Sequence, residues 1–350
     1  MTYYPVIIPT LNRYQHFKAC VESLSACTHA EKTELIIGLD YPPSEKYVQG
    51  WKKIKEYVKS IQGFKKVIVF EHSHNLGSVG NWKFLANYIK QHYDAWIESE
   101  DDNVFSPCFL DYMNKVLNKY KNYTNILAVS AYMDPVNFTV PRQNKSNVLR
   151  TQFYFAWGLG KWRRTDEILD KSMPVHYMQY VCSHRKVLRK MRNNLRDLYQ
   201  LIFWTKYNPK LDIRCDFTIS CFCVINNMYV INPMLSLVRN MGHDGSGEHC
   251  VDLKNDYFSN QKISEKTVFD INDSLSENQN KELIAEWENF KTIDFLDEHR
   301  KLALKCYYIY MIFGYRLGTF IIDFKDNLKS ILRPFYHKIK KIFQKSKSDK

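Results

Sequence analysis

The sequence predicts an α/β protein built on a mostly parallel sheet, and three observations predict it. Apolar runs typical of buried parallel strands occupy residues 4–12, 34–40 and 66–71. Amphipathic helical patterns separate these runs, one directly after Arg13 and another over 46–61. Turn residues close each run, and the strand–helix alternation favours a Rossmann-like, doubly wound sheet with crossover helices.

Length and composition place the chain among ordinary globular proteins. Its 350 residues can bury a large core and form one or two domains, with 45% hydrophobic and 25% charged residues. The nine cysteines include no CxxC pair, which argues against a zinc ribbon or thioredoxin motif and favours a reducing compartment. Cys221 and Cys223 lie two apart in an apolar run, which predicts one face of a strand. The first apolar run begins almost at Met1, so we expect no secretory leader.

The net charge of +13 is concentrated at the end of the chain. Residues 299–350 contain thirteen lysines and arginines against three acids, which leaves +3 for the first 298 residues. Basic charge confined to a tail does not line a groove, so we expect no nucleic-acid partner.

An acidic turn follows a further apolar run. Residues 94–102 form a short predicted buried strand that ends in the three carboxylates of residues 100–102. Ser106 is a suitable N-cap and Pro107 a suitable first residue for a helix over 106–120. Ligands bind at the carboxyl ends of strands in open α/β sheets, and packed carboxylates need a cation between them. Mg²⁺ or Mn²⁺ would suit these oxygen ligands, whereas the alternative is a solvated acidic turn.

A glycine-containing loop lies between the third apolar run and the acidic turn. Residues 75–81 read Asn-Leu-Gly-Ser-Val-Gly-Asn, and Gly77 and Gly80 permit tight turns or close backbone approach to a ligand. The loop opens a predicted helix over 81–92, whose N-terminus favours anions. It is neither a Walker loop nor a GxGxxG fingerprint, so both a phosphate loop and a plain turn remain possible.

Three stretches in the second half carry possible chemistry. Residues 151–164 are dense in aromatics around Trp157, and predict either a buried loop or a surface that stacks on a sugar ring. Asp216 opens a helical or strand-like apolar stretch, where it is either an N-cap or a functional acid. The loop over 237–250 is polar and glycine-rich, and its histidines could complete a metal site or remain ordinary surface residues.

The tail predicts contact with a membrane surface. Residues 306–322 are apolar and aromatic, but Arg316 and two glycines break the run before the ~20 residues that a span needs. Residues 335–343 alternate basic and apolar side chains, which favours an interfacial helix on anionic lipid. The alternative is a helix docked on the rest of the protein with a solvated basic end. Before this tail, residues 251–298 predict a polar helical segment.

The order of these motifs resembles the GT-A glycosyltransferases, most closely those of the bacterial family 2 type. The resemblance lies in residues 5–13, the strand-end Asp40, the loop 75–81 and the acidic triplet 100–102, within a stretch of roughly 4–250. The segments 100–112, 158–160 and 237–247 are also similar to the Golgi N-acetylglucosaminyltransferases that initiate complex N-glycans. Members of the family often have Asp-x-Asp at this position, whereas this chain has Glu-Asp-Asp at 100–102. No role is therefore assigned to Glu100.

The resemblance implies a role for individual residues. Asp102 would be the direct ligand of a divalent metal, and Asp216 matches the position of the catalytic base in inverting members. The loop over 242–249 would close over the diphosphate, with His243 and His249 as further candidate metal ligands. The residues expected to bind nucleotide or substrate are Pro9, Thr10, Arg13, Asp40, Asn75, Gly77, Gly80, Asp101, Trp157, Gly158, Gly245 and Ser246.

Together these features predict a GT-A catalytic domain over 1–250, with a nucleotide-sugar half at about 1–105, an acceptor half at about 106–250 and a helical C-terminal extension. We expect a metal-dependent, inverting glycosyltransferase that uses Mn²⁺ or Mg²⁺ and a UDP-sugar. The acceptor would be a glycan or lipid-linked molecule in bacterial capsule or lipopolysaccharide synthesis, on the cytoplasmic face of the cell membrane. A sugar nucleotidyltransferase and a membrane-bound binding protein without activity are the alternatives.

Overall fold

The computed structural model describes residues 1–139, 145–173, 176–194, 215–247, 256–291 and 305–324. The chain divides into two compact units. Unit 1 comprises Met1–Met173 and Asn226–Phe290, and unit 2 comprises Pro174–Ile225 and Lys291–Lys350. Unit 1 is therefore assembled from two separate stretches of chain, and the domain boundaries expected from the sequence stay a prediction.

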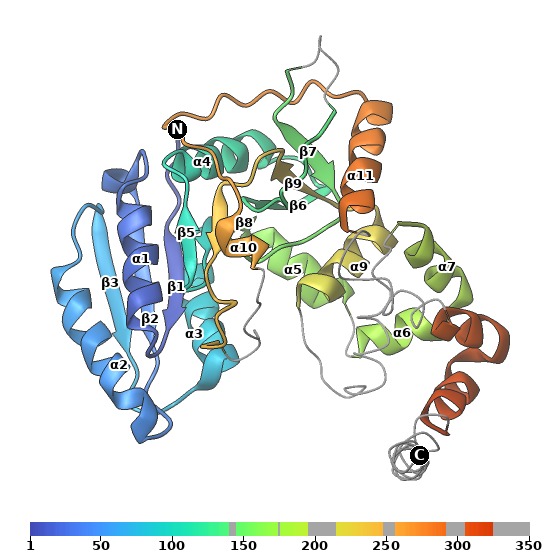
Figure 1. The fold of residues 1–350 in the computed structure, drawn as a ribbon, viewed down its shortest axis with the longest axis horizontal. Coiled ribbons are helices and arrows are strands. Elements are labelled where there is room, and N and C mark those ends of the chain that lie inside the picture. Colours follow the sequence, from blue (N-terminus) through green and yellow to red (C-terminus); the bar gives the residue numbers. More distant parts are fainter. Residues whose placement is uncertain (140–144, 174–175, 195–214, 248–255, 292–304, 325–350) are drawn as a thin grey trace, which may run out of the picture. The chain divides into compact units, whose positions relative to one another are not determined.

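The core of unit 1 is an eight-stranded sheet in its described residues (Figure 1). Its strands are β1 (Val6–Thr10), β2 (Glu34–Leu39), β3 (Lys66–Glu71), β4 (Ala95–Glu98), β6 (Ile126–Ser130), β7 (Val148–Thr151), β8 (Leu159–Trp162) and β9 (Tyr229–Pro233). Their order across the sheet is β3-β2-β1-β4-β8-β6-β9-β7. A separate ribbon pairs β5 (Asn103–Phe105) with β10 (Val238–Asn240) in antiparallel register.

The first half of the sheet is parallel. β1 pairs with β2 and β4, and β2 pairs with β3, all in parallel register. β6 and β9 are also parallel, while β8 is antiparallel to both its neighbours and β7 is antiparallel to β9. The predicted fold class is confirmed, because a mostly parallel sheet is flanked by helices.

Helices cover both faces of this sheet. In unit 1 they are α1 (Tyr14–Ser25), α2 (Glu45–Tyr57), α3 (Gly77–His92), α4 (Phe109–Tyr120), α5 (Arg163–Ser172), α10 (Tyr257–Asn260) and α11 (Glu277–Lys291), with short 3-10 turns at Ala30–Lys32 and Val58–Ser60. Successive side chains of a strand point to opposite faces. Val6 and Ile8 therefore pack with Phe17 of α1 on one face, while Ile7 packs with Leu85 and other α3 residues on the other.

Two predicted helix starts differ from the structure. Helix α3 begins at Gly77, four residues before the predicted start at 81, so Gly80 lies in its first turn. Helix α4 begins at Phe109, and Ser106 is not its N-cap. The Ser106 hydroxyl instead donates to the carbonyl of Ser264, and its own carbonyl accepts from Phe109 N at 2.9 Å. The side chain of Ser106, which local propensity favours as an N-cap, therefore makes a tertiary hydrogen bond instead.

Unit 2 is helical in its described residues. It contains α6 (Tyr177–Ser183), α7 (Arg185–Asn194), α9 (Asp216–Asn226, whose last residue belongs to unit 1) and helical backbone over 305–324. Cys221 and Cys223 lie in α9, so the strand expected for them is wrong, although both side chains are buried. Gly314 has a φ of 74°, a left-handed value that interrupts regular helix geometry.

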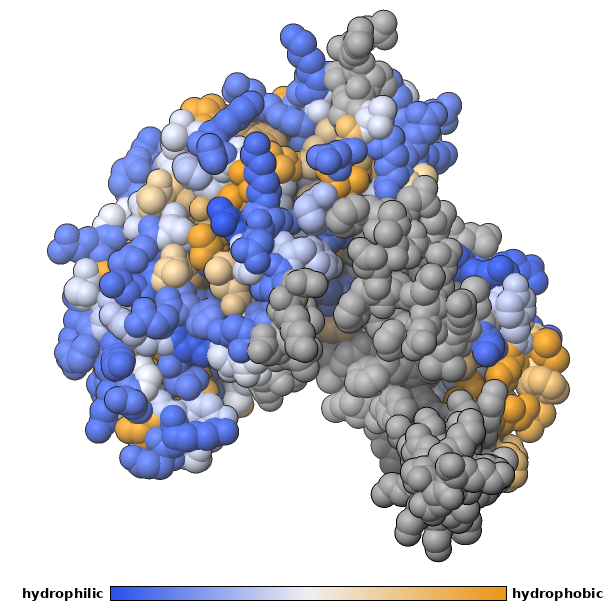
Figure 2. Space-filling model, viewed as in Figure 1, coloured by the Kyte–Doolittle hydropathy of each residue, from blue (hydrophilic) through white to orange (hydrophobic). Residues whose placement is uncertain are grey.

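Apolar side chains gather on the surface of the segment 305–324 (Figure 2). Those exposed by about half or more are Tyr308, Ile312, Phe313, Leu317, Phe320 and Phe324. Among the described residues, no helix has both the length and the apolar character that crossing a membrane requires. The predicted interfacial helix at 335–343 lies outside the described residues.

Candidate active site

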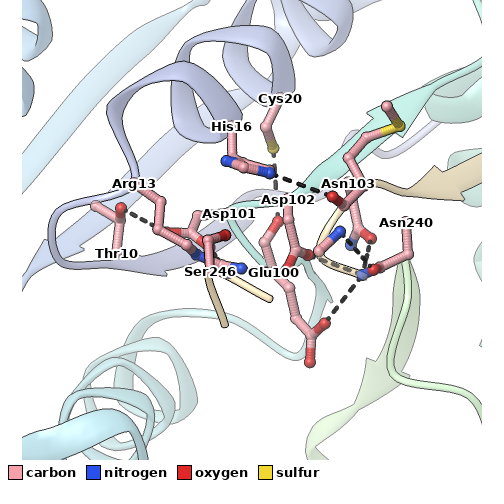
Figure 3. Close-up of polar contacts among 12 residues, drawn as sticks. Thr10, Arg13, His16, Cys20, Glu100, Asp101, Asp102, Asn103, Asn240 and Ser246 are labelled. Atoms are coloured by element: carbon pink, nitrogen blue, oxygen red, sulfur yellow. Dashed lines mark hydrogen bonds and ion pairs between the residues drawn. The ribbon is translucent and has the colours of Figure 1, made fainter. Parts of the chain in front are cut away.

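Two buried carboxylates lie side by side where β4 ends. The strand stops at Glu98, and a short turn carries Glu100, Asp101 and Asp102 before β5 begins (Figure 3). Asp101 and Asp102 are 6% and 5% exposed, whereas the Glu100 residue is exposed. The parallel neighbour β1 ends at the same edge, which brings its last residue and the residues that follow it to the acidic turn.

Arg13 joins both buried carboxylates. One of its terminal nitrogens, Nη2, pairs with Asp101 Oδ1, and the other, Nη1, lies 2.8 Å from Asp102 Oδ2. Thr10, the last residue of β1, donates its hydroxyl to Asp101 Oδ2 at 2.8 Å. Both oxygens of Asp101 are therefore bound, and the guanidinium forms a fork between two carboxylates.

The charges of this cluster stabilise one another. Burial acts to lower the pKa of Arg13, but Asp101 and Asp102 raise it above its ordinary value, so the guanidinium stays charged. Burial raises the pKa of Asp101, Arg13 opposes that rise, and the neighbouring charge of Asp102 adds to it. Arg13 therefore offsets part of the negative charge that the two buried carboxylates bring together.

The ribbon β5–β10 delivers an amide to the other side of Asp102. Asn240 pairs with Asn103 in the register of the ribbon, and its Nδ2 donates to Asp102 Oδ1 at 2.8 Å. The same amide lies 3.4 Å from Glu100 Oε2. Its carbonyl accepts from Gly242 N at 2.9 Å, which ties the following loop to the acidic turn.

Gly242 leaves the space next to the carboxylate open. A Cβ built at this glycine would lie 2.2 Å from Asp102 Oδ2, closer than any real side chain could approach. The preceding residue, Met241, donates its backbone N–H to the Asp102 carbonyl at 2.8 Å. The backbone of the loop therefore lies directly against the carboxylate. Because Gly242 has no side chain, a small space remains beside Oδ2, which we call the cradle.

The loop after β10 is also attached to α1. His16 Nε2 lies 3.2 Å from the carbonyl of Met241 and 3.2 Å from Asp244 Oδ2. Asp244 Oδ1 accepts from Ser246 N at 2.9 Å, and Gly245 between them has a φ of 77°. Asp244, Gly245 and Ser246 are all exposed, so the described part of this loop is an exposed turn attached to α1, and its closure over a diphosphate stays a prediction.

His243 lies among aromatic rings. It stacks on Phe258 with ring centroids 4.3 Å apart, and Trp157 meets it edge-on at 5.7 Å. Its Nδ1 atom is buried and has no hydrogen-bond partner. The structure therefore places the ring of His243 in an aromatic cluster next to the loop that lines Asp102, and its role as a metal ligand stays a prediction.

The residues present fit a divalent cation only as a sparse site. Among the described residues, no group of three or more His, Cys, Asp or Glu side chains is gathered tightly enough to hold a metal. Mg²⁺ and Mn²⁺ sites that use phosphate ligands need only one or two protein carboxylates. Asp102 would supply one such carboxylate beside the open space at Gly242, and the ligand role expected for His243 stays a prediction.

Asp40 organises the neighbouring loop. Its Oδ1 accepts from Leu76 N at 2.9 Å and from Tyr41 N at 2.8 Å, and its Oδ2 accepts from the Asn75 side chain at 3.1 Å. The N-terminal end of α3 is thus already hydrogen-bonded to a buried carboxylate. Asp40 and Asn75 are brought together as predicted, but the contacts in the structure are with each other.

Three further predicted residues, Pro9, Gly77 and Gly158, have a structural explanation for their position. Pro9 lies within β1 opposite Gly38, and Gly77 has a φ of 71° at the first residue of α3. Gly158 also has a left-handed φ, of 64°, and its Cβ would lie 2.9 Å from Phe109, so packing alone requires a glycine there. The predicted loop 158–160 is wrong beyond Gly158, because Leu159 and Gly160 belong to β8.

Trp157 is the centre of a partly buried aromatic cluster. Its ring lies edge-on to Tyr132 at 4.7 Å and to Phe258 at 5.2 Å, and Tyr257 packs on Phe258 at 4.0 Å. Tyr257 is 45% exposed. The ring of Trp157 therefore packs within the cluster, and the stacking of a sugar on this stretch stays a prediction.

Two predicted residues lie outside the described part of unit 1. Asp216 is the first residue of α9 and belongs to unit 2. His249 lies outside the described residues. The roles proposed for both stay predictions.

Sequence reasoning did not single out Asn240 or His16. Asn240 follows a two-residue apolar pair, Leu237 and Val238, and immediately precedes the glycine-containing loop. A polar residue at the end of a short strand before such a loop is the signal that could have identified it. His16 carries no such signal, because its partner Asp244 is 228 residues away in the chain.

A comparison with protein families gives one match. The family model described as Glycosyl transferase family 2 matches residues 6–224, more than half of the chain. That stretch contains Thr10, Arg13, the acidic turn and Asp216. No curated protein shows significant similarity to the chain.

Solved structures with a similar arrangement are distant in sequence. TarS of S. aureus is 12% identical with a TM-score of 0.39, covering 89% of this chain and 48% of that protein. This chain therefore spans about half the length of TarS. The mannosyltransferase PcManGT of Pyrobaculum calidifontis, in complex with GDP-Man and Mn²⁺, is 13% identical with a TM-score of 0.33, covering 52% of each chain.

Proposed function

The chain belongs to glycosyl transferase family 2, and from that premise we propose that it transfers a sugar from a UDP-sugar to a glycan or lipid-linked acceptor, with inversion. The observation that carries the proposal is the buried acid pair at the carboxyl edge of the parallel strands, where ligands bind in open α/β sheets. The transfer of a hexose or an N-acetylhexosamine is the finer form of this prediction.

Asp102 and His243 would hold Mn²⁺ or Mg²⁺ together with the two phosphates of the donor. The bound cation would supply charge neutralisation for the nucleoside diphosphate as it leaves. The chain itself orients the metal ligand, because Asn240 holds Asp102 Oδ1 and the backbone of Met241 holds the Asp102 carbonyl. Asp101 would serve the site indirectly by holding Arg13, which faces the donor phosphates.

Asp216 would act as the general base that takes the proton of the acceptor hydroxyl during attack on the anomeric carbon. The proposal rests on its match to the family position and on its place at the first residue of α9. There the positive end of the helix dipole stabilises a charged carboxylate. General-base catalysis is commonly worth about 10²–10⁴-fold in rate. Asp216→Asn is therefore expected to lower transfer by that factor and to leave UDP binding unchanged.

The acceptor sugar would stack on the aromatic cluster around Trp157. Flat rings suit the apolar face of a sugar, and Tyr257 contributes an exposed ring to the same cluster. The predicted roles of Gly158, Gly245 and Ser246 near the substrates rest on this arrangement and on the loop that carries His243.

A panel of sugar nucleotides tests the proposal. The full chain is incubated with each UDP-, GDP- and dTDP-sugar in the presence of Mn²⁺ or Mg²⁺, and release of the nucleoside diphosphate is measured. We expect release from at least one UDP-sugar, loss of that release on addition of EDTA, and loss of turnover in Asp102→Asn with an unchanged melting temperature. Turnover in Asp102→Asn at the wild-type rate would exclude Asp102 as the metal ligand.

The exposed apolar segment 305–324 and the basic sequence that follows it support a peripheral location. Buried apolar area and attraction of lysines to anionic lipid add together at a membrane surface. We place the protein at the cytoplasmic face of the cell membrane, where acceptors for capsule or lipopolysaccharide are lipid-linked. Family membership favours glycosyl transfer over nucleotidyl transfer.

A further inference from the structure

Arg13 already supplies a positive charge to the position that the proposed function gives to a metal. Asp102 has two side-chain oxygens, and both are engaged, Oδ2 by Arg13 Nη1 at 2.8 Å and Oδ1 by Asn240 Nδ2 at 2.8 Å. Asn240 is neutral and does not repel a cation. Arg13 does, because its side chain is 19% exposed and little water screens its charge from a cation bound to the same carboxylate.

Both carboxylates that Arg13 contacts are held on their second oxygen. Thr10 donates to Asp101 Oδ2, and Asn240 donates to Asp102 Oδ1. The acids are therefore fixed from β1 and β10, and the guanidinium between them is the group that can change its contacts. A rotation of the guanidinium about the Asp101 contact would release Nη1 from Asp102 and leave Arg13 in place at the edge of the sheet.

We infer that Arg13 is an exchangeable internal counter-ion that couples metal binding to donor binding. In the absence of donor, Arg13 neutralises Asp102 and a metal ion must compete with it. When a nucleoside diphosphate binds, its phosphates would accept hydrogen bonds from Nη1, and Asp102 would then be free to hold the cation. This inference rests on the proposed function, and it adds a residue that sets the order and cooperativity of binding.

The coupling has a measurable form. If metal and nucleotide each displace or accept the same arginine, each must raise the affinity of the other by the same factor. Couplings of this kind commonly amount to roughly 5–150-fold. Removal of the positive charge should strengthen the binding of metal alone and remove the part of the coupling that Arg13 contributes. A residue that merely builds the pocket would instead weaken the binding of metal alone when it is replaced.

The experiment measures free Mn²⁺ by electron paramagnetic resonance in titrations of the full chain, with and without UDP. For the wild type we expect weak Mn²⁺ binding alone and binding roughly tenfold tighter with UDP. Arg13→Gln keeps a hydrogen-bonding side chain without charge, and is expected to bind Mn²⁺ alone at least about fivefold tighter, with an effect of UDP that is smaller than in the wild type. Arg13→Lys keeps the charge but loses the fork, and should retain weak binding of Mn²⁺ alone.

Arg163→Gln is the matched control. Arg163 also forms an ion pair, with Asp94 at 3.0 Å, but it is 41% exposed and makes no contact with the acid pair in the described structure. It should leave both Mn²⁺ titrations unchanged. Melting temperatures of all variants report whether each one folds.

The outcomes separate the two proposals. The inference is overturned if Arg13→Gln binds Mn²⁺ alone no more tightly than wild type and keeps the full effect of UDP. The proposed metal site would then still stand. If Arg13→Gln does not fold, Arg13→Lys that binds Mn²⁺ alone much more tightly than wild type overturns it as well. If wild type binds no Mn²⁺ even with UDP, the metal in the proposed function is wrong, and the role of Arg13 falls with it.

Discussion

At Gly242 the distance between loop backbone and carboxylate leaves no room for a side chain. A methyl group there would reach within 2.2 Å of Asp102 Oδ2, so Gly242→Ala must displace either the loop or the acid. We expect the variant to fold, because the exposed turn over Asp244–Ser246 lets the loop shift. It should lose at least about tenfold in affinity for Mn²⁺ with UDP, which corresponds to about 1.4 kcal/mol. Isothermal titration calorimetry measures this loss.

Gly242→Ala with wild-type affinity would show that the cradle beside Oδ2 is not where the cation binds. Ser146→Ala serves as a control for a small buried substitution in unit 1, since its hydroxyl contacts backbone carbonyls of Val148 and Asn272 far along the chain from the acidic turn. It should alter stability and leave the affinity for Mn²⁺ unchanged.

Single residues of the site could be predicted where a local sequence pattern indicates them. Asp101 and Asp102 end an apolar run, and this placed them at a strand end correctly. Their partners were not readable, because Arg13 lies 88 residues from Asp101 and Asn240 lies 138 residues from Asp102. Contacts over such separations are fixed by strand order and register, which a single sequence does not contain.

Among the elements, β8 carries a buried lysine that pairs with one carboxylate on the neighbouring strand β4 and one on the helix α5. Lys161 Nζ lies 2.9 Å from Glu98 Oε1 on β4 and 2.8 Å from Asp166 Oδ1 on α5. Trp82 and Trp96 each place a ring about 5 Å from the same ammonium. Removing one member of a buried ion pair leaves an uncompensated charge, so Lys161→Met is expected to cost about 3–5 kcal/mol in the free energy of unfolding. Urea denaturation measures it.

Lys55→Met is the control for that prediction, because Lys55 pairs with Glu71 at the surface and should cost at most about 1 kcal/mol. The pH dependence gives a second readout. Burial acts to raise the pKa of Asp166, but Lys161 and then Lys90 lower it below its ordinary value of 3.8. A lowered pKa gives stability that is present above pH 3.8 and is lost as the pH falls through the folded value, so acid unfolding should begin at higher pH in Lys161→Met. Identical acid transitions would contradict this.

Elements with a strong periodic signal were predicted, and those without one were missed. The strands β1, β2 and β3 are apolar runs closed by turn residues, and all three are present. β8 reads Leu-Gly-Lys-Trp, in which a buried charge and a glycine hide the strand pattern. β10 has three residues, too few for any period to show. Tertiary pairing, which the sequence does not display, makes both of them strands.

At the scale of the whole molecule, the exposed apolar segment of unit 2 predicts binding to lipid. Ile312 and Phe320 are each 64% exposed. The double substitution Ile312→Ser with Phe320→Ser removes apolar area that would enter the interface, and is expected to lower cosedimentation with vesicles of phosphatidylglycerol and phosphatidylcholine by roughly tenfold or more. Circular dichroism confirms that the variant is folded.

Tyr123→Ser is the matched control, since Tyr123 is 51% exposed in unit 1 and outside the tail. Its cosedimentation should equal that of the wild type. Equal vesicle binding by the double variant and the wild type would exclude residues 305–324 as the lipid-contacting surface, and would leave the basic sequence after 324 as the remaining candidate.

The discontinuity of unit 1 has a consequence for how the protein is made. A nascent chain that has reached Met173 contains β7 but lacks β9, the strand that joins β7 to β6. It also lacks β10, and with it the amide that holds Asp102. Long-range pairings of this kind form slowly, because the intervening chain must first be ordered or looped out. Translation must therefore pass through the whole of 174–225 before the ribosome has delivered the last ligand-orienting residue, and a chain released earlier would carry an acid pair without its amide.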